Sequence, residues 1–196
     1  MKSVGEAMSI GKNFKQSFQK AMRSLETGRA GFGADGKDGA WESLADEKLE
    51  ELLKRPNAGR IFAVHAALKR GWSVDKLYEM TRIDLWFLRH FEELASYESE
   101  IQGAGSLEKL AADRPLFLQA KEFGYSDRQI AFLLSTTEDE VRAARMAIDV
   151  KPVYGIVDTC AAEFVAYTPY FYSTYGDVNE SKTSDRKKIM ILGGGP

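Results

Sequence analysis

A long stretch of helical periodicity, from residue 41 to residue 148, most constrains the fold of this chain. Apolar side chains recur there at spacings of three and four, as in amphipathic helices that bury one face. The segment 82–91 is apolar on most sides, which predicts burial in a core or in a subunit contact. We predict helices over residues 41–53, 57–70, 74–80, 85–97 and 113–124, with two more that begin after Ser126 and Thr137 and end near Ile148.

An internal repeat lies within this helical region. Residues 67–81 realign with residues 120–134, and each unit reads as a helix, a Gly-aromatic-Ser turn, a short helix and a longer helix. Trp72 and Tyr125 occupy equivalent positions, so we expect them to fill equivalent gaps under their turns. Two copies are too few for an open solenoid. The repeat therefore predicts one compact helical domain.

The N-terminal part has three segments. Residues 1–11 alternate weakly and suggest a short extended edge piece. Asn13 is a candidate N-cap with Gln16 in the capping-box position, ahead of an apolar stripe that predicts a helix over residues 14–25. Five glycines lie between residues 27 and 39. This composition predicts a linker, and with it the first domain boundary.

Beyond Pro152 the pattern changes. Six aromatic residues crowd into residues 164–175, with Pro169 among them. Neither helical nor strand periodicity is kept, which predicts an irregular extended segment. Because so much aromatic area is costly to leave in water, we expect it to lie against the helical domain or a neighbouring one. Residues 176–188 are polar and are predicted to loop over the surface.

The last residues combine an apolar run, Ile189–Leu192, with the triplet Gly193, Gly194 and Gly195 before Pro196. Such a run is typical of a buried parallel strand. The glycines are typical of a tight turn or of a backbone that a ligand approaches closely. The triplet is not GxGxxG and lacks the P-loop lysine, so it is a weak signal for a nucleotide site. A strand without a sheet predicts that the chain is a piece of a larger protein.

Composition excludes several classes of function. The formal net charge of −2 gives no basic field for nucleic acid or for an anionic membrane. No apolar run reaches the length of a membrane span, and the N-terminus lacks the apolar core of a signal peptide, so we expect a cytoplasmic protein. One cysteine and two histidines cannot form a disulfide or a Cys/His metal cluster.

Individual polar residues give no catalytic signal. Cys160 has no activating histidine nearby in sequence and is interpreted as a structural thiol. Asp158 is interpreted as a hydrogen-bonded anchor and Glu163 as a surface or interface carboxylate. His65 and His90 are interpreted as structural. We therefore predict no catalytic residue and no metal ligand.

One alternative is an independent helical interaction module or a helix-turn-helix DNA-binding module. The segment 124–148 has the helix-turn-helix pattern. Its second helix, however, would present Glu138, Asp139 and Glu140 at its N-terminal end. Phosphates repel these carboxylates, and no Arg, Asn or Gln is positioned there to read a base edge. Ordinary helix packing is therefore the favoured interpretation.

Several motifs together resemble the large chain of carbamoyl phosphate synthetase. They are MKSVGEAMSIG with its following helix, RIDLWFLRHFEEL, KEFGYSD, VYGIVDTCAAEF, the TPYFYSTY run and DRKKIMILGGGP. The resemblance covers nearly the whole chain in the same order, and residues 29–44 match least well. It implies a mainly α fold: a compact multi-helix oligomerisation domain with short extended or β stubs of flanking ATP-grasp domains at both termini.

The same resemblance implies a division of the chain. Residues 1–31 would be the C-terminal edge of the first ATP-grasp half, and residues 32–157 the helical oligomerisation domain. Residues 158–186 would be an aromatic-rich crossover segment. Residues 187–196 would be the first strand and glycine turn of the second half, with Gly193, Gly194 and Gly195 at the border of the second active site.

The resemblance also implies the chemistry of a parent enzyme. That enzyme is a glutamine-hydrolysing, ATP-dependent carbon–nitrogen ligase that makes carbamoyl phosphate from bicarbonate, glutamine-derived ammonia and two ATP, for arginine and pyrimidine biosynthesis. MgATP and potassium would bind outside this chain, which itself would hold no cofactor and be inactive. Its partners would be the flanking ATP-grasp domains, a glutaminase small subunit and further copies of itself, with no nucleic acid and no membrane.

Overall fold

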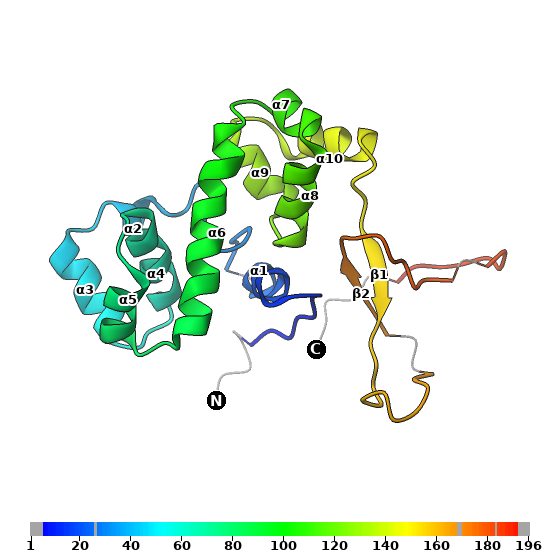
Figure 1. Cartoon of the computed structure of the whole chain (residues 1–196), viewed down its shortest axis with the longest axis horizontal. Coiled ribbons are helices and arrows are strands. Elements are labelled where there is room, and N and C mark those ends of the chain that lie inside the picture. The colour runs from blue at the N-terminus through cyan, green and yellow to red at the C-terminus, as the bar shows by residue number, and fades with distance from the viewer. Residues whose placement is uncertain (1–5, 26, 168–169, 183, 192–196) are drawn as a thin grey trace.

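The structure, a computed structural model, describes residues 6–25, 27–167, 170–182 and 184–191. These residues form ten helices and one two-stranded sheet, which confirms the mainly α prediction. The long helix α6 stands between α2–α5 on one side and α7–α10 on the other, with α1 across its lower part (Figure 1). The helices are α1 Phe14–Ser24, α2 Gly39–Glu42, α3 Asp46–Lys54, α4 Arg60–Lys69, α5 Val74–Thr81, α6 Leu85–Gly103, α7 Leu107–Ala112, α8 Arg114–Glu122, α9 Asp127–Leu133 and α10 Glu138–Ala147.

The predicted helix starts are largely confirmed because their caps are local. The Asn13 side chain accepts a hydrogen bond from the backbone N–H of Gln16 at 2.9 Å. Ser126 and Thr137 each form a complete capping box at the start of α9 and α10. Such caps satisfy backbone donors that the first turn of a helix leaves unpaired.

The single helix predicted over residues 41–53 is wrong, because α2 and α3 are separate. The guanidinium of Arg70, from the end of α4, donates to the carbonyl oxygens of Glu42 (2.9 Å) and Leu44 (2.6 Å). It also pairs with Asp46 in the first turn of α3. A distant arginine therefore satisfies carbonyls at the break, which no local pattern reveals. The helix predicted over 85–97 continues to Gly103, and α7 was not predicted.

The sequence repeat is also a repeat of hydrogen bonds. The backbone N–H of Trp72 donates to Ala67 at 3.1 Å, and the N–H of Tyr125 donates to Ala120 at 3.0 Å. The glycines before the two aromatics, Gly71 and Gly124, have φ of 77° and 88°. Each unit therefore ends its first helix with the same left-handed glycine turn. Tyr125 is fully buried, whereas Trp72 is half-buried and carries a lysine over its ring.

The linker predicted over residues 27–39 is wrong, because most of this segment is buried. Phe32 is 0% exposed and its ring lies 4.9–5.2 Å from those of Phe18, His65 and Phe91. It therefore joins α1, α4 and α6 at the centre of the core. Glycine lets the backbone of this segment approach α4 closely, because a Cβ on Gly33 (φ 81°) would lie 2.2 Å from His65 Nε2.

Side chains from distant helices satisfy the buried backbone of this segment. The N–H of Phe32 donates to Gln19 Oε1 at 2.7 Å, and Gln129 Nε2 donates to the carbonyl oxygen of Gly33 at 2.9 Å. Arg29 forms ion pairs with Asp35 (3.0 Å between Nε and Oδ2) and with Asp38, all three nearly buried. Buried backbone groups require such partners. The segment is therefore part of the core.

A buried ionic cluster ties α8, α9 and α10 together. The ammonium of Lys121 lies 2.7 Å from Asp127 Oδ1, and Arg145 Nε lies 2.9 Å from Asp127 Oδ2. Burial lowers the pKa of Lys121 to about 8, although the carboxylate of Asp127 raises it. Burial alone would raise the pKa of Asp127, but Lys121 and Arg145 hold it below its usual value. One carboxylate therefore serves two buried cations, and the more exposed Arg142 of α10 lies 3.9 Å from it.

The C-terminal part forms a β-hairpin where an irregular segment was predicted. Strand β1 (Val153–Ile156) pairs antiparallel with β2 (Phe171–Thr174), with Val153 opposite Thr174 and Ile156 opposite Phe171. The hairpin stands beside α1 (Figure 1). Thr174 Oγ1 donates to Gln16 Oε1 at 2.9 Å, and Lys20 donates to the carbonyl oxygen of Ser173. Because the two strands are separated by a long loop, no short-range sequence pattern indicates that they pair.

The run Ile189–Leu192 is typical of a buried strand for which the sequence offers no sheet, and its described part, residues 189–191, is not a strand here. Ile189, Met190 and Ile191 are 85–91% exposed and have no regular secondary structure. No described strand lies beside them to satisfy their backbone. Leu192 lies outside the described residues.

Replacing Phe32 by alanine tests the buried position of the 27–39 segment. We expect Phe32→Ala to lower the free energy of unfolding by about 3–5 kcal/mol, because it leaves a cavity among three rings. The matched control is Phe164→Ala, at a position that is 75% exposed; its effect should stay within about 0.5 kcal/mol. Urea unfolding measures both, and equal small effects would contradict a core position.

The buried lysine predicts a pH dependence of stability. Lys121 titrates near pH 8 in the folded chain and near 10.5 when unfolded, so the unfolded chain binds more protons between these values. The free energy of unfolding of the wild type minus that of Lys121→Met should therefore rise over this window, by on the order of 1–3 kcal/mol. The corresponding difference for exposed Lys109→Met should stay flat. A flat difference for both would contradict the burial of the Lys121 charge.

Candidate functional site

An aromatic patch lies where α1 crosses the start of α6. We call Phe14, Trp86, Phe87 and His90 the α6 patch. Trp86 is 51% exposed, and its ring lies 5.1 Å from that of Phe14, 5.0 Å from that of Phe87 and 4.3 Å from that of His90. The opposite side of α6 is buried in the core at Leu88, Phe91 and Leu94. The core predicted for residues 82–91 is confirmed for one face of α6, and the other face is exposed, so the predicted subunit contact stays a prediction for that face.

Charged side chains border the α6 patch. Lys15 forms an ion pair with Glu93, and the Nδ1 atom of His90 lies 3.5 Å from the same carboxylate. An apolar centre with a polar rim is the usual composition of a protein–protein contact. His90 is thus part of this surface, in agreement with its structural interpretation.

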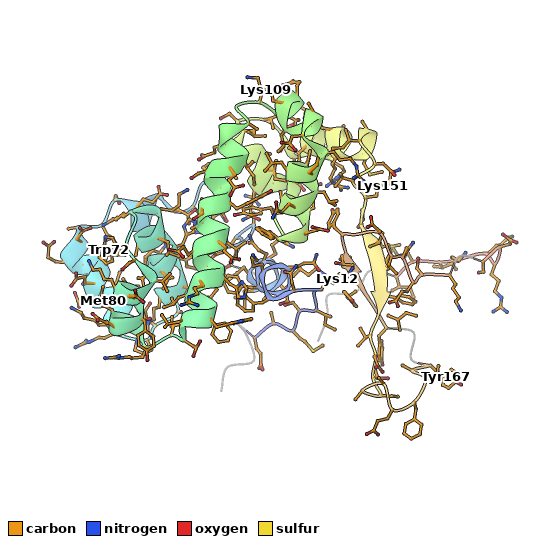
Figure 2. The ribbon with its side chains drawn as sticks, viewed as in Figure 1. Lys12, Trp72, Met80, Lys109, Lys151 and Tyr167 are labelled. Atoms are coloured by element: carbon orange, nitrogen blue, oxygen red, sulfur yellow. The ribbon has the colours of Figure 1, made fainter. Side chains whose placement is uncertain are left out.

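A second aromatic surface belongs to the hairpin and its connecting loop. Phe164 and Tyr167 in the loop are 75% and 90% exposed, and Tyr170 and Phe171 at the start of β2 are also exposed. Tyr167 lies at the far end of the loop, away from the helices (Figure 2). We call Phe164, Tyr167, Tyr170 and Phe171 the hairpin patch. The sequence predicts that these rings lie against the helical domain or a neighbouring one. In the structure, the helical body does not cover them.

The loop residues near Cys160 have a structural arrangement. Asp158 accepts hydrogen bonds from the backbone N–H groups of Cys160 (2.9 Å) and Ala162 (2.6 Å). This confirms the interpretation of Asp158 as an anchor of the turn. Glu163 is exposed, as expected, and Cys160 lies in the same turn without a described histidine beside it.

His65 belongs to a buried pair in the core. Its Nε2 lies 2.8 Å from Glu98 Oε1, and Lys69 lies 2.9 Å from the other oxygen of the same carboxylate. The ring also packs edge-on against Phe32. These contacts link α4 to α6, which confirms the structural interpretation. Glu98 and Lys69 were not singled out from the sequence, because their partners come from different helices.

The remaining sequence predictions concern nucleotide, metal and membrane sites. Gly193, Gly194 and Gly195 lie outside the described residues. Within the described part of the chain, no group of three His, Cys, Asp or Glu side chains is arranged to hold a metal ion. Of the helices described, none has both the length and the apolar character needed to span a membrane.

The helix-turn-helix segment has the acidic end that the sequence predicts. Glu140 is engaged in the capping box of α10, and Glu138 pairs with Arg142 at 3.3 Å on the same helix. Its neighbour Asp139 is 93% exposed at the side chain. An exposed acidic N-terminus is unsuited to the phosphate backbone of DNA. The arrangement gives the DNA-binding alternative no support.

Comparison with known proteins identifies the family. Residues 6–149 match the model of the carbamoyl-phosphate synthetase large chain oligomerisation domain. The chain therefore belongs to this family, and its helical body is the oligomerisation domain of a carbamoyl phosphate synthase large chain. The resemblance noted from the sequence motifs is confirmed.

Relatives from three kinds of organism match the chain over its full length. It is 49% identical to the carbamoyl phosphate synthase large chain of Archaeoglobus fulgidus, covering 18% of that protein, and 51% identical to that of Nostoc sp., covering 17%. It is 49% identical to the arginine-specific, chloroplastic large chain of Oryza sativa subsp. japonica, covering 16%. The chain thus spans less than a fifth of the length of these curated relatives.

Proposed function

We propose that this chain is the connecting and oligomerisation segment of an enzyme that makes carbamoyl phosphate from bicarbonate, glutamine-derived ammonia and two ATP. The parent enzyme would be a glutamine-hydrolysing ligase that uses MgATP and potassium and serves arginine and pyrimidine biosynthesis in the cytoplasm. The identity of 49–51% to named synthase large chains, over the whole length of this chain, supports this proposal. The chain itself would be inactive and would hold no cofactor.

We propose the domain division that the sequence motifs imply, although the family match over residues 6–149 begins the oligomerisation domain before residue 32. Residues 1–31 would end the first ATP-grasp half, residues 32–157 form the oligomerisation domain, residues 158–186 cross over, and residues 187–196 begin the second half. Close packing of α1 against α6 argues that the helical body also includes α1. Gly193–Gly195 would border the second active site of the parent, whose partners would include a glutaminase small subunit.

The observation that carries the assembly role is the α6 patch. Trp86 and Phe87 are each at least 41% exposed, although their rings pack edge-on against one another and both contact the ring of Phe14. Clustered aromatic rings in water are costly, and aromatic residues dominate the binding energy of protein contacts. We assign this patch to contact with a second copy of the chain. The hairpin patch would instead contact a flanking ATP-grasp half.

Sedimentation of the chain tests the assembly role. We expect the wild type to self-associate, and the double variant Trp86→Gln/Phe87→Gln to raise the dissociation constant by at least about tenfold, because the buried rings are lost from the contact. The control Tyr78→Gln removes a ring on α5 that is 37% exposed and should leave association unchanged. Circular dichroism checks that all variants remain folded. A monomeric wild type, or equal association of the double variant, would contradict the assignment.

Proteolysis tests the assignment of the hairpin patch. Chymotrypsin should cleave the 196-residue chain rapidly after Phe164 or Tyr167, because both are exposed in a loop. In the full-length large chain the same sites should be protected at least about tenfold by the flanking half. Phe117 and Tyr125, which are buried, serve as internal controls that resist cleavage in both. If Phe164 and Tyr167 were cleaved as fast in the full-length large chain as in the 196-residue chain, the crossover contact would be excluded.

A further inference from the structure

A cavity of about 340 Å³ lies between α1, the turn before α9 and the hairpin. Its charged lining residues are Lys20 and Arg23 from α1 and Lys121 from α8. No aspartate or glutamate lines it among the described residues. The remaining lining is rich in hydrogen-bonding groups, including the side chains of Gln16, Tyr154, Ser173, Thr174 and Tyr175.

The cations of this cavity are held in place by neutral partners. Arg23 donates one N–H to the carbonyl oxygen of Gly124 at 2.8 Å, and Lys20 donates to the carbonyl oxygens of Ile10 (2.8 Å) and Ser173. Neither forms an ion pair with any carboxylate in the described part of the chain. Backbone carbonyls fix the position of these groups without neutralising their charge.

The third cation, Lys121, has only part of a counter-charge. Its ammonium donates to Asp127 (2.7 Å) and to the carbonyl oxygen of Tyr125 (2.6 Å), but the same carboxylate also binds Arg145. The carboxylate of Asp127 is therefore divided between two buried cations, while Lys20 and Arg23 have no carboxylate partner among the described residues. Burial and then the charge of Arg23 lower the pKa of Lys20, which agrees with unneutralised charge at this place.

We propose that this cavity binds a phosphate-type dianion. Uncompensated positive charge in a half-buried site is costly, and an anion that fills it would relieve the repulsion among the three side chains. A phosphate group carries close to two negative charges at neutral pH and several strong acceptor oxygens, which suits an excess of cations better than one carboxylate. The free guanidinium donors of Arg23 match such oxygens.

The location gives this site a structural consequence. Lys20 joins α1 to β2, and Lys121 joins α8 to the turn before α9. A dianion between them would hold the hairpin against the helical body. The cavity shares no lining residue with the α6 patch, so phosphate binding can be tested separately from the assembly role proposed above.

Calorimetric titration with inorganic phosphate at constant ionic strength, in a chloride background, tests the proposal. The wild type should bind phosphate, and Arg23→Gln should weaken binding about tenfold or more through loss of a charge-assisted contact. Lys20→Gln should also weaken it, whereas Lys109→Gln, an exposed lysine at the far end of the helices (Figure 2), should bind as the wild type does. Thermal unfolding without phosphate checks the fold of each variant.

A parallel titration with methyl phosphate distinguishes free phosphate from a phosphate ester. Tighter binding of methyl phosphate would assign the site to the phosphate group of a larger molecule, and weaker binding would assign it to the free ion; both results support the proposal. The proposal would be overturned if neither phosphate nor methyl phosphate gave a binding heat. It would also be overturned if folded Arg23→Gln and Lys20→Gln bound phosphate as tightly as the wild type does.

Discussion

The buried segment 29–38 is the constraint on which the rest of the fold depends. A loop in a core carries backbone groups that need partners, and here Gln19 and Gln129 supply them from α1 and α9. Phe32 fills the space between α1, α4 and α6. The segment therefore packs between α1, α4, α6 and α9, and these contacts fix α1 to the rest of the helical body.

Local signals in the sequence predict most of the helices, and non-local contacts explain what they miss. Caps such as Asn13 and Ser126 act within three residues, so the helix starts can be read from the sequence. Arg70 binds carbonyl oxygens at the break between α2 and α3, although it lies 28 residues from Glu42 in the sequence. Glycine-rich composition indicates a linker and a close backbone approach equally well, and only the distant partners of residues 29–38 decide between them.

The candidate surfaces could be predicted in part. Apolar residues on most sides of the 82–91 segment indicate a contact, and the crowded rings of residues 164–175 indicate a covered surface, but neither pattern gives a partner. The cavity cations leave no signal, because Lys20 and Lys121 are brought together by the fold alone. A packed helical body with exposed aromatic surfaces at α6 and at the hairpin agrees with the contacts proposed for it, to a second copy and to a flanking domain.

Amide hydrogen exchange at Phe32 tests most directly whether the helical body is built around the buried segment. Its N–H donates to Gln19 Oε1 within the core. We predict that this amide exchanges only through global unfolding, with a protection free energy equal to the free energy of unfolding measured by urea. Exchange of Phe32 as fast as that of the exposed loop around Phe164 would contradict the account, because the segment would then be a surface linker.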